Sequence, residues 1–141
     1  MRSGSESGSA GLFPKLFYDD APAAIGWLER AFGFRRRLVV PGADGRVLHA
    51  EMSLGAAVIM VGSSRPEQRC VSPRRLAGVG QVLCVHVDDP DAHCARARAA
   101  GAEVETEPAE ESNGSRGYSA RDLEGHAWHF GSYVPGESWT G

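Results

Sequence analysis

The sequence predicts an α+β protein built from two tandem β-α-β-β-β modules, each forming a curved sheet with its helix packed on one face. Two observations lead to this prediction. Turn and capping residues divide the 141-residue chain into the same series of elements twice. The landmarks of the two series also keep a nearly constant spacing, because Asp19-Asp20 precedes Asp88-Asp89 by 69 positions and Gly55 precedes Gly125 by 70.

The first module starts with an apolar segment, residues 12–18, that predicts a strand. Asp20 is suited to cap a helix and Pro22 to occupy its first turn. Apolar residues then follow at helical spacing, and Gly33 stands where a left-handed C-cap is expected. Three more strands are expected in this module. They span residues 35–40, 47–54 and 57–61.

The second module repeats this order. A strand over residues 81–87 leads to Asp89 and Pro90, which again indicate a helix start. The Ala- and Arg-rich helix over residues 91–100 is closed by Gly101. A short acidic strand at a sheet edge and a final hairpin complete the module. These three strands span residues 103–107, 117–121 and 127–131.

The chain is interpreted as one domain, residues 12–134, with a disordered Ser/Gly-rich tail before it and an irregular tail after it. Module one spans residues 12–62 and module two spans residues 81–134. The loop between them, residues 63–80, holds four arginines against the single acid Glu67. A loop of this length is either a solvated linker or a lid that faces an anion. The tails are residues 1–11 and 135–141.

Composition excludes several classes of protein. The formal net charge of −3 gives no general attraction to nucleic acid or to anionic membranes. No apolar run reaches the roughly 18 residues of a membrane-spanning helix, and the N-terminal residues do not resemble an export signal. We therefore expect a cytoplasmic protein. The three cysteines, an odd number, are expected to be reduced and mostly to fill space in the core.

Alternation along the strands sorts side chains between the helix-covered face and the concave face of each sheet. On the strand over residues 47–54, Leu48 is expected under the helix, and His49 and Glu51 on the open face. His93 and His126 are expected to face solvent. The concave faces, taken together, form a mixed apolar and polar hollow suited to a small molecule. The residues expected there are Phe13, Lys15, Phe17, His49, Glu51, Cys84, His86 and His129.

The doubled module resembles the vicinal oxygen chelate superfamily, which includes glyoxalase I, bleomycin-resistance proteins, fosfomycin-modifying enzymes and extradiol dioxygenases. The resemblance covers roughly residues 12–134 and implies a glyoxalase/bleomycin-resistance fold with curved mixed sheets, helices on the convex face and a concave ligand cup. It also implies that Ser119 and Arg121 line the pocket. The segments that carry it are residues 16–25, 31–34, 49–52, 59–60, 85–89 and 122–128.

The resemblance further implies where a metal would be held, because metal-dependent members place one ligand on each of four strands. Those positions look like Phe13, Ile59 or Met60, Val82 and His129 here. A catalytic divalent ion needs about three protein ligands, and His129 alone qualifies. No cofactor is therefore expected at the usual positions. The alternative is a displaced site for Zn, Ni, Mn or Fe made by His49, Glu51 and His129.

Four functions stay open. The first is a homodimer that binds a small organic molecule in a cup completed by its partner, with Phe13 and Phe17 giving affinity and polar residues giving orientation. The second is a metal-dependent lyase or isomerase at the displaced site. The third is a metal-free enzyme with His49 or His129 as general base and Glu51 as its orienter. The fourth is a structural dimer with a vestigial pocket.

Overall fold

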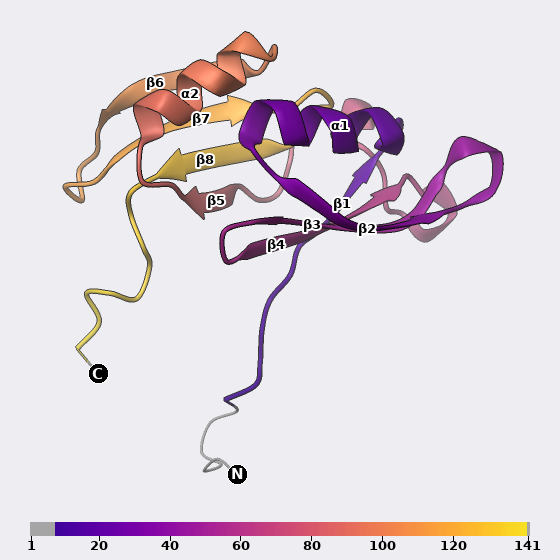
Figure 1. Cartoon of the computed structure of the whole chain (residues 1–141), viewed down its shortest axis with the longest axis horizontal. Coiled ribbons are helices and arrows are strands. Elements are labelled where there is room, and N and C mark those ends of the chain that lie inside the picture. Colours follow the sequence, from indigo (N-terminus) through magenta and orange to yellow (C-terminus); the bar gives the residue numbers. More distant parts are fainter. Residues whose placement is uncertain (1–7, 141) are drawn as a thin grey trace.

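The computed structural model describes residues 8–140 and contains two four-stranded mixed sheets, each with one helix on its convex side (Figure 1). The predicted fold class is thereby confirmed. Part of the predicted N-terminal tail, residues 1–7, lies outside the described residues, as does Gly141. In the first sheet the order is β1-β4-β3-β2, and in the second it is β5-β8-β7-β6. The first strand of each module runs parallel to the last one.

The elements have these bounds. The first module holds β1 (Lys15–Tyr18), α1 (Ala21–Phe32), β2 (Arg35–Pro41), β3 (Val47–Leu54) and β4 (Ala57–Ser63). The second holds β5 (Leu83–His86), α2 (Pro90–Ala99), β6 (Glu103–Glu110), β7 (Arg116–Arg121) and β8 (Ala127–Gly131).

Both helices begin at the predicted caps. The side chain of Asp20 accepts a hydrogen bond from the Ala23 amide at 3.1 Å, and that of Asp89 accepts one from the Ala92 amide at 3.0 Å. Gly33 ends α1 in the left-handed conformation, with φ of 86°, which a side chain would strain. The cap residues thus place both helices at equivalent points of the two modules.

Several strand bounds differ from the prediction. β1 starts at Lys15 rather than at residue 12, because Pro14 has no amide hydrogen and only its carbonyl pairs with β4. β5 is also shorter than predicted. β6 instead continues to Glu110, through two register irregularities against β7, so it is three residues longer than predicted.

One side-chain assignment on β3 is wrong. Leu48, predicted under the helix, is 54% exposed, whereas its neighbour Val47 is 5% exposed. The pairing of β2 with β3 shifts at this point, from Val40 opposite His49 to Pro41 opposite Val47. The resulting bulge leaves Leu48 unpaired and reverses the alternation before it. Beyond the bulge, His49 and Glu51 keep the predicted open face.

The two modules share one hydrophobic core. The Phe32 ring at the end of α1 lies 5.2 Å from Trp128 and 4.6 Å from Phe130, both on β8. The indole of Trp27 donates a 2.7 Å hydrogen bond to the carbonyl of Ala100 after α2. Helices α1 and α2 therefore lie side by side above the two sheets (Figure 1). This packing fixes the relative orientation of the sheets.

The turn between β7 and β8 connects the modules through buried carboxylates. One oxygen of Asp122 accepts three backbone amides of its own turn, and the other accepts the Tyr18 hydroxyl at 2.7 Å and the Trp128 indole at 3.0 Å. The Glu124 carboxylate accepts the amides of Asp19 and Asp20 at 2.7 and 2.9 Å. The end of β1 and the start of α1 are thereby attached to the second module.

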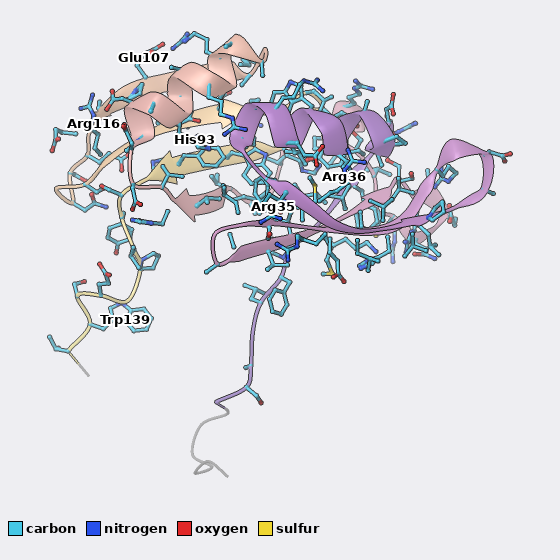
Figure 2. All side chains as sticks on the ribbon, viewed as in Figure 1. Arg35, Arg36, His93, Glu107, Arg116 and Trp139 are labelled. Carbon is cyan, nitrogen blue, oxygen red and sulfur yellow. The ribbon has the colours of Figure 1, made fainter. Side chains whose placement is uncertain are left out.

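Two histidines expected in solvent are instead at this junction. His126 is 6% exposed, and its Nε2 donates to the Phe17 carbonyl at 3.0 Å. His93 lies on α2 (Figure 2), with Nε2 2.9 Å from the Phe32 carbonyl and Nδ1 2.5 Å from the Tyr118 hydroxyl. Burial lowers the pKa of His93. Both predictions failed because each ring finds its acceptor in the other module.

The segment between the modules is attached to the protein surface, which differs from a freely solvated linker. Ser72 is fully buried, and its hydroxyl donates to Glu124. Arg75 forms an ion pair with Asp19 at 3.2 Å. Short 3-10 turns lie within it at Pro66–Gln68 and Pro73–Arg75. Beyond β8 the chain is irregular, and Trp139 is 78% exposed (Figure 2). No helix within residues 8–140 is long and apolar enough to cross a bilayer.

Candidate ligand-binding site

The open face of the first sheet carries a chain of three polar side chains. The Lys15 ammonium on β1 lies 3.3 Å from His49 Nδ1, and His49 Nε2 lies 2.9 Å from Glu51, both on β3. An ammonium can only donate, so the geometry suits His49 as acceptor at Nδ1 and donor at Nε2. Glu51 therefore contacts His49 and does not itself pair with Lys15.

An aromatic ring and a second cation lie beside this chain. Lys15 Nζ is 5.8 Å from the centre of the Phe17 ring, and the Arg65 guanidinium carbon is 5.6 Å from it. Gly62 on β4 faces the same group, since a Cβ there would approach Lys15 Cε at 3.2 Å and the Phe17 ring at 3.7 Å. Burial and the nearby charge of Arg65 lower the pKa of Lys15.

The second sheet lines a cavity of about 330 Å³. Its polar centre is His129 on β8, whose Nε2 lies 2.7 Å from the Glu111 carboxylate. The hydrogen bond from His129 lowers the pKa of Glu111. Apolar surface surrounds this pair, so the cavity combines the two kinds of lining that small-molecule sites use. The lining residues are Cys84, Val85, His86, Glu111, Asn113, His129, Gly131, Tyr133, Val134 and Pro135.

Two glycines make the space for the His129 ring. A Cβ at Gly117 on β7 would lie 2.8 Å from Nε2 and Cε1 of His129, and one at Gly131 would lie 2.9 Å from Cε1. Such distances are too short for non-bonded atoms in contact. The ring therefore lies over the backbone of these two glycines and reaches Glu111 beyond the end of β6.

The remaining predicted residues of the second sheet make contacts within the chain. Ser119 bonds the Thr106 hydroxyl at 2.7 Å. Arg121 pairs with Glu105 at 3.1 Å and donates to the Gly125 carbonyl at 3.2 Å. The polar atoms of Ser119 and Arg121 are thus engaged in contacts within the second sheet. The Lys15 and His129 groups are therefore stronger candidates for contacting a ligand.

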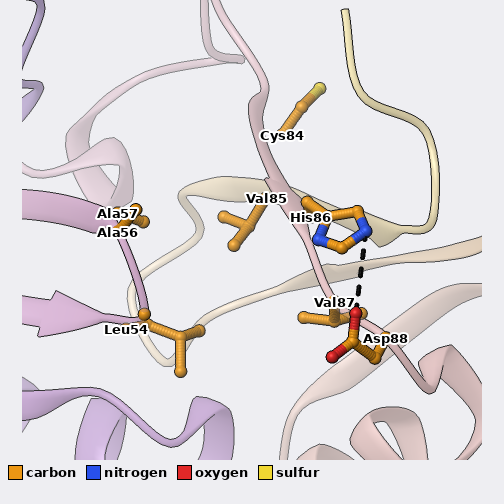
Figure 3. Close-up of a pocket in the computed structure, with 9 residues that line it drawn as sticks. Leu54, Ala56, Ala57, Cys84, Val85, His86, Val87 and Asp88 are labelled. Atoms are coloured by element: carbon orange, nitrogen blue, oxygen red, sulfur yellow. Dashed lines mark ion pairs between the residues drawn. The ribbon is translucent and has the colours of Figure 1, made fainter. Parts of the chain in front are cut away.

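A larger cleft of about 440 Å³ lies between the β3–β4 turn and β5 (Figure 3). His86 and Asp88 line it, and their side chains lie 3.9 Å apart in an exposed position. It offers fewer converging polar groups than the cavity at His129. Cys84 also lines it, but burial and the charge of Glu111 raise the pKa of this thiol. A raised pKa disfavours the thiolate, which argues against Cys84 as a nucleophile.

Sequence reasoning missed residues on both open faces. Glu111 lies beyond the acidic strand predicted over residues 103–107 and was not singled out, and Arg65 was assigned to the linker. Their partners, His129 and Phe17, lie 18 and 48 positions away, so no local pattern links them. Apolar residues also lie on the concave face of the first sheet, because they stand directly opposite Ser53, Glu51 or His49 in the strand pairing. These are Leu38, Val40, Val58 and Met60.

The donor set does not fit the metal site that related folds imply. At the corresponding positions, Phe13, Ile59, Met60 and Val82 cannot ligate a borderline or hard divalent cation, which leaves His129. The displaced trio is not brought together in one chain, since His49 pairs with Glu51 on the first sheet and His129 with Glu111 on the second. Within residues 8–140, no three His, Cys, Asp or Glu side chains gather as a metal site.

Comparison with known proteins agrees with this architecture. Over 126 residues the chain is 32% identical to an uncharacterised protein of Mycobacterium tuberculosis, covering 87% of this chain and 74% of the relative. It is 34% identical to TioX from Micromonospora sp. ML1, with a TM-score of 0.68, over 88% of this chain and all of TioX. A glyoxalase/bleomycin resistance protein/dioxygenase from Nocardioides shares the fold at 17% identity, with a TM-score of 0.67 over 94% and 91% of the two chains.

The sequence profile of one family matches residues 12–130, which include both helices and all eight strands except Gly131 at the end of β8. The chain belongs to the Glyoxalase/Bleomycin resistance protein/Dioxygenase superfamily.

Proposed function

We propose that this protein binds a small organic molecule in a cup that is completed when two chains associate, and that it does so without the metal quartet of related enzymes. In this arrangement the open face of the first sheet of one chain meets the open face of the second sheet of its partner. The Lys15–His49–Glu51 group and the His129–Glu111 pair then face one ligand from opposite sides, and a dimer has two equivalent sites.

The observation that carries the proposal is the cavity around His129. Its volume of about 330 Å³ falls within the range of ligand sites. Tyr133, Val134 and Pro135 provide apolar contact area, while His129 and Glu111 provide a directed polar pair. This combination favours an amphipathic or partly aromatic ligand over an ion or a polymer.

The rigid junction between the modules supports a cup made by two chains. Closing the two sheets of one chain over each other would require breaking the shared core at Phe32 and Trp128. It would also break the hydrogen bonds that the Glu124 carboxylate accepts from the amides of Asp19 and Asp20. Leaving such a carboxylate buried without partners is costly. A second chain can supply the missing wall without this cost.

Exposed apolar side chains near the sheet edges support the same conclusion. Leu12 and Phe13 are 92% and 55% exposed, and Val82, just before β5, is 55% exposed. Leu12 and Phe13 line, with Val58 and Leu83, a smaller cavity of about 210 Å³. Large apolar groups gathered on an open surface are typical of an interface.

The test combines mass and binding. Sedimentation equilibrium is expected to give twice the chain mass, and Phe13→Asp with Val82→Asp is expected to give monomers. The wild-type dimer should be stabilised against thermal unfolding by flat aromatic compounds, as mass action requires, whereas a folded monomeric variant should not. A wild-type monomer that binds these compounds equally well would overturn the proposal.

Acid–base catalysis without a metal is a second candidate, favoured by the His129–Glu111 pair. A carboxylate that accepts from Nε2 holds the imidazole in one orientation and leaves Nδ1 as the basic nitrogen. Such an enzyme would exchange an acidic C–H of its bound ligand for deuterium in heavy water. That exchange should disappear in His129→Gln while binding persists. Unchanged exchange in the variant would reject His129 as the base.

The metal-dependent alternative is tested by elemental analysis of protein purified without chelators, followed by titration with Zn, Ni, Mn and Fe. The proposal expects no stoichiometric metal in the wild-type dimer. One ion per chain, lost in His129→Ala, would instead establish a displaced metal site between chains.

A further inference from the structure

We propose that the ligand is a planar aromatic anion, and that Lys15, Arg65 and Phe17 form the subsite that selects it. This inference rests on the proposed function, which supplies the enclosed cup, and adds the chemical class of the molecule. A carboxylate, sulfonate or phenolate attached to an aromatic ring satisfies the description. The three residues come from β1 and from the segment that follows β4.

Two cations are held around one aromatic ring. Lys15 Nζ and Arg65 Cζ lie 5.8 and 5.6 Å from the centre of the Phe17 ring. Each cation gains from the ring quadrupole, but the two positive charges repel each other. An anion placed between them would attract both cations and offset their mutual repulsion. Enclosure by a partner chain would strengthen both attractions, because water would be removed.

Among residues 8–140, the side-chain polar contacts of both cations are with groups other than carboxylates. Lys15 contacts His49 Nδ1, and Arg65 donates to the Leu48 carbonyl at 2.8 Å. Neither partner is a carboxylate, and in the part of the chain that the structure describes neither cation forms an ion pair with one. Five other arginines do form such pairs at 3.2 Å or less. They are Arg36, Arg75, Arg98, Arg116 and Arg121.

The surface around the ring is open to a flat ligand. Phe17 and Lys15 are each partly exposed, and their neighbour across the strands is Gly62, which has no side chain to cover them. A flat ring system can therefore lie against Phe17 while its anionic group accepts hydrogen bonds from Lys15 and Arg65. Charge-assisted bonds of this kind are stronger than neutral ones.

Two fluorescent probes with one scaffold test the inference. 8-Anilinonaphthalene-1-sulfonate carries an anionic group, and N-phenyl-1-naphthylamine is the same molecule without it. The wild-type dimer is expected to bind both, and the sulfonate more tightly. Lys15→Met and Arg65→Met should each weaken binding of the sulfonate by about tenfold. Binding of the neutral probe should change by less than about twofold. Phe17→Leu should weaken binding of both probes.

A charge-matched control is Arg37→Gln, which removes an exposed cation at the bulge of β2, outside the subsite. It should leave both affinities unchanged, and thermal unfolding should show that every variant is folded. Equal affinity for the two probes, or no effect of Lys15→Met on the sulfonate, would overturn the anion subsite and leave the proposed function standing. Failure of the wild-type dimer to bind either probe would overturn both proposals.

Discussion

The hydroxyl of Tyr18 donates a 2.7 Å hydrogen bond to the carboxylate of Asp122, 104 positions later in the chain. The bond joins the end of β1 in the first module to the turn before β8 in the second. Burial and the adjacent Asp122 raise the pKa of Tyr18 well above its ordinary value, so the phenol stays protonated and keeps donating. The two modules are thus connected by a buried polar contact as well as by apolar packing.

Tyr18→Phe is expected to destabilise the protein by about 1–3 kcal/mol, because one donor to a buried carboxylate is lost. Urea unfolding measures the loss. Tyr133→Phe provides the matched control, since Tyr133 is 43% exposed, and should change stability by less than about 0.5 kcal/mol. Equal effects of the two substitutions would contradict the assigned role of the Tyr18 hydroxyl.

Stability is expected to fall as the pH is lowered below 6.5, the ordinary pKa of histidine, because of His93. Its folded-state pKa is lowered, so between that value and pH 6.5 the unfolded chain binds a proton that the folded chain does not. Stability therefore rises with pH across this window and is fully present above it. Carboxylates with lowered pKa values act in a more acidic window.

The variant His93→Gln isolates this effect. Gln can still donate to the Phe32 carbonyl and accept from Tyr118, but it does not titrate. Denaturant midpoints measured from pH 7.5 to 5 should slope less in the variant than in the wild type. An unchanged slope would show that another group controls the acid sensitivity.

Gly117→Ala is expected to displace the His129 ring, because the new Cβ would lie 2.8 Å from it. We expect a stability loss of about 1–3 kcal/mol from overpacking and weaker binding of N-phenyl-1-naphthylamine. Gly80→Ala is the control, since nothing lies within 4 Å of a Cβ there. If Gly117→Ala binds the probe like the wild type, the position of the ring is not required for the site.

The sequence predicted the elements that depend on local chemistry. Asp20, Gly33 and Asp89 define helix ends by their own side chains or backbone conformations, so the helices were predicted closely. Alternation on β8 likewise predicted His129 on the open face, and its neighbours Trp128 and Phe130 are buried in the core. Such features are determined within a few residues.

Features that depend on distant partners were not predictable in this way. His93 was expected in solvent because nothing near it in sequence reveals the Phe32 carbonyl, 61 positions earlier. The bulge at Leu48 arises from pairing with β2, and Glu111 meets His129 only after the sheet has formed. Alternation therefore placed His49, Glu51 and His129 on the open faces, whereas it could not reveal the contacts that Glu111 and Arg65 make there.

A heterodimer of complementary variants tests most directly whether one binding cup is built from two chains. One chain carries Phe17→Ala in its first module, and the other carries Cys84→Trp, which fills the cavity of the second. Co-expression with two tags and tandem purification isolates the heterodimer, and N-phenyl-1-naphthylamine reports binding. Each variant homodimer has the same defect in both of its sites.

If each cup is shared between two chains, one site of the heterodimer contains both substitutions. The other site contains neither and is wild type. We therefore expect about one probe molecule bound per heterodimer with wild-type affinity, and weak binding to both variant homodimers. A heterodimer that binds the probe no better than the two homodimers would contradict this expectation, because each cup would then be built within a single chain.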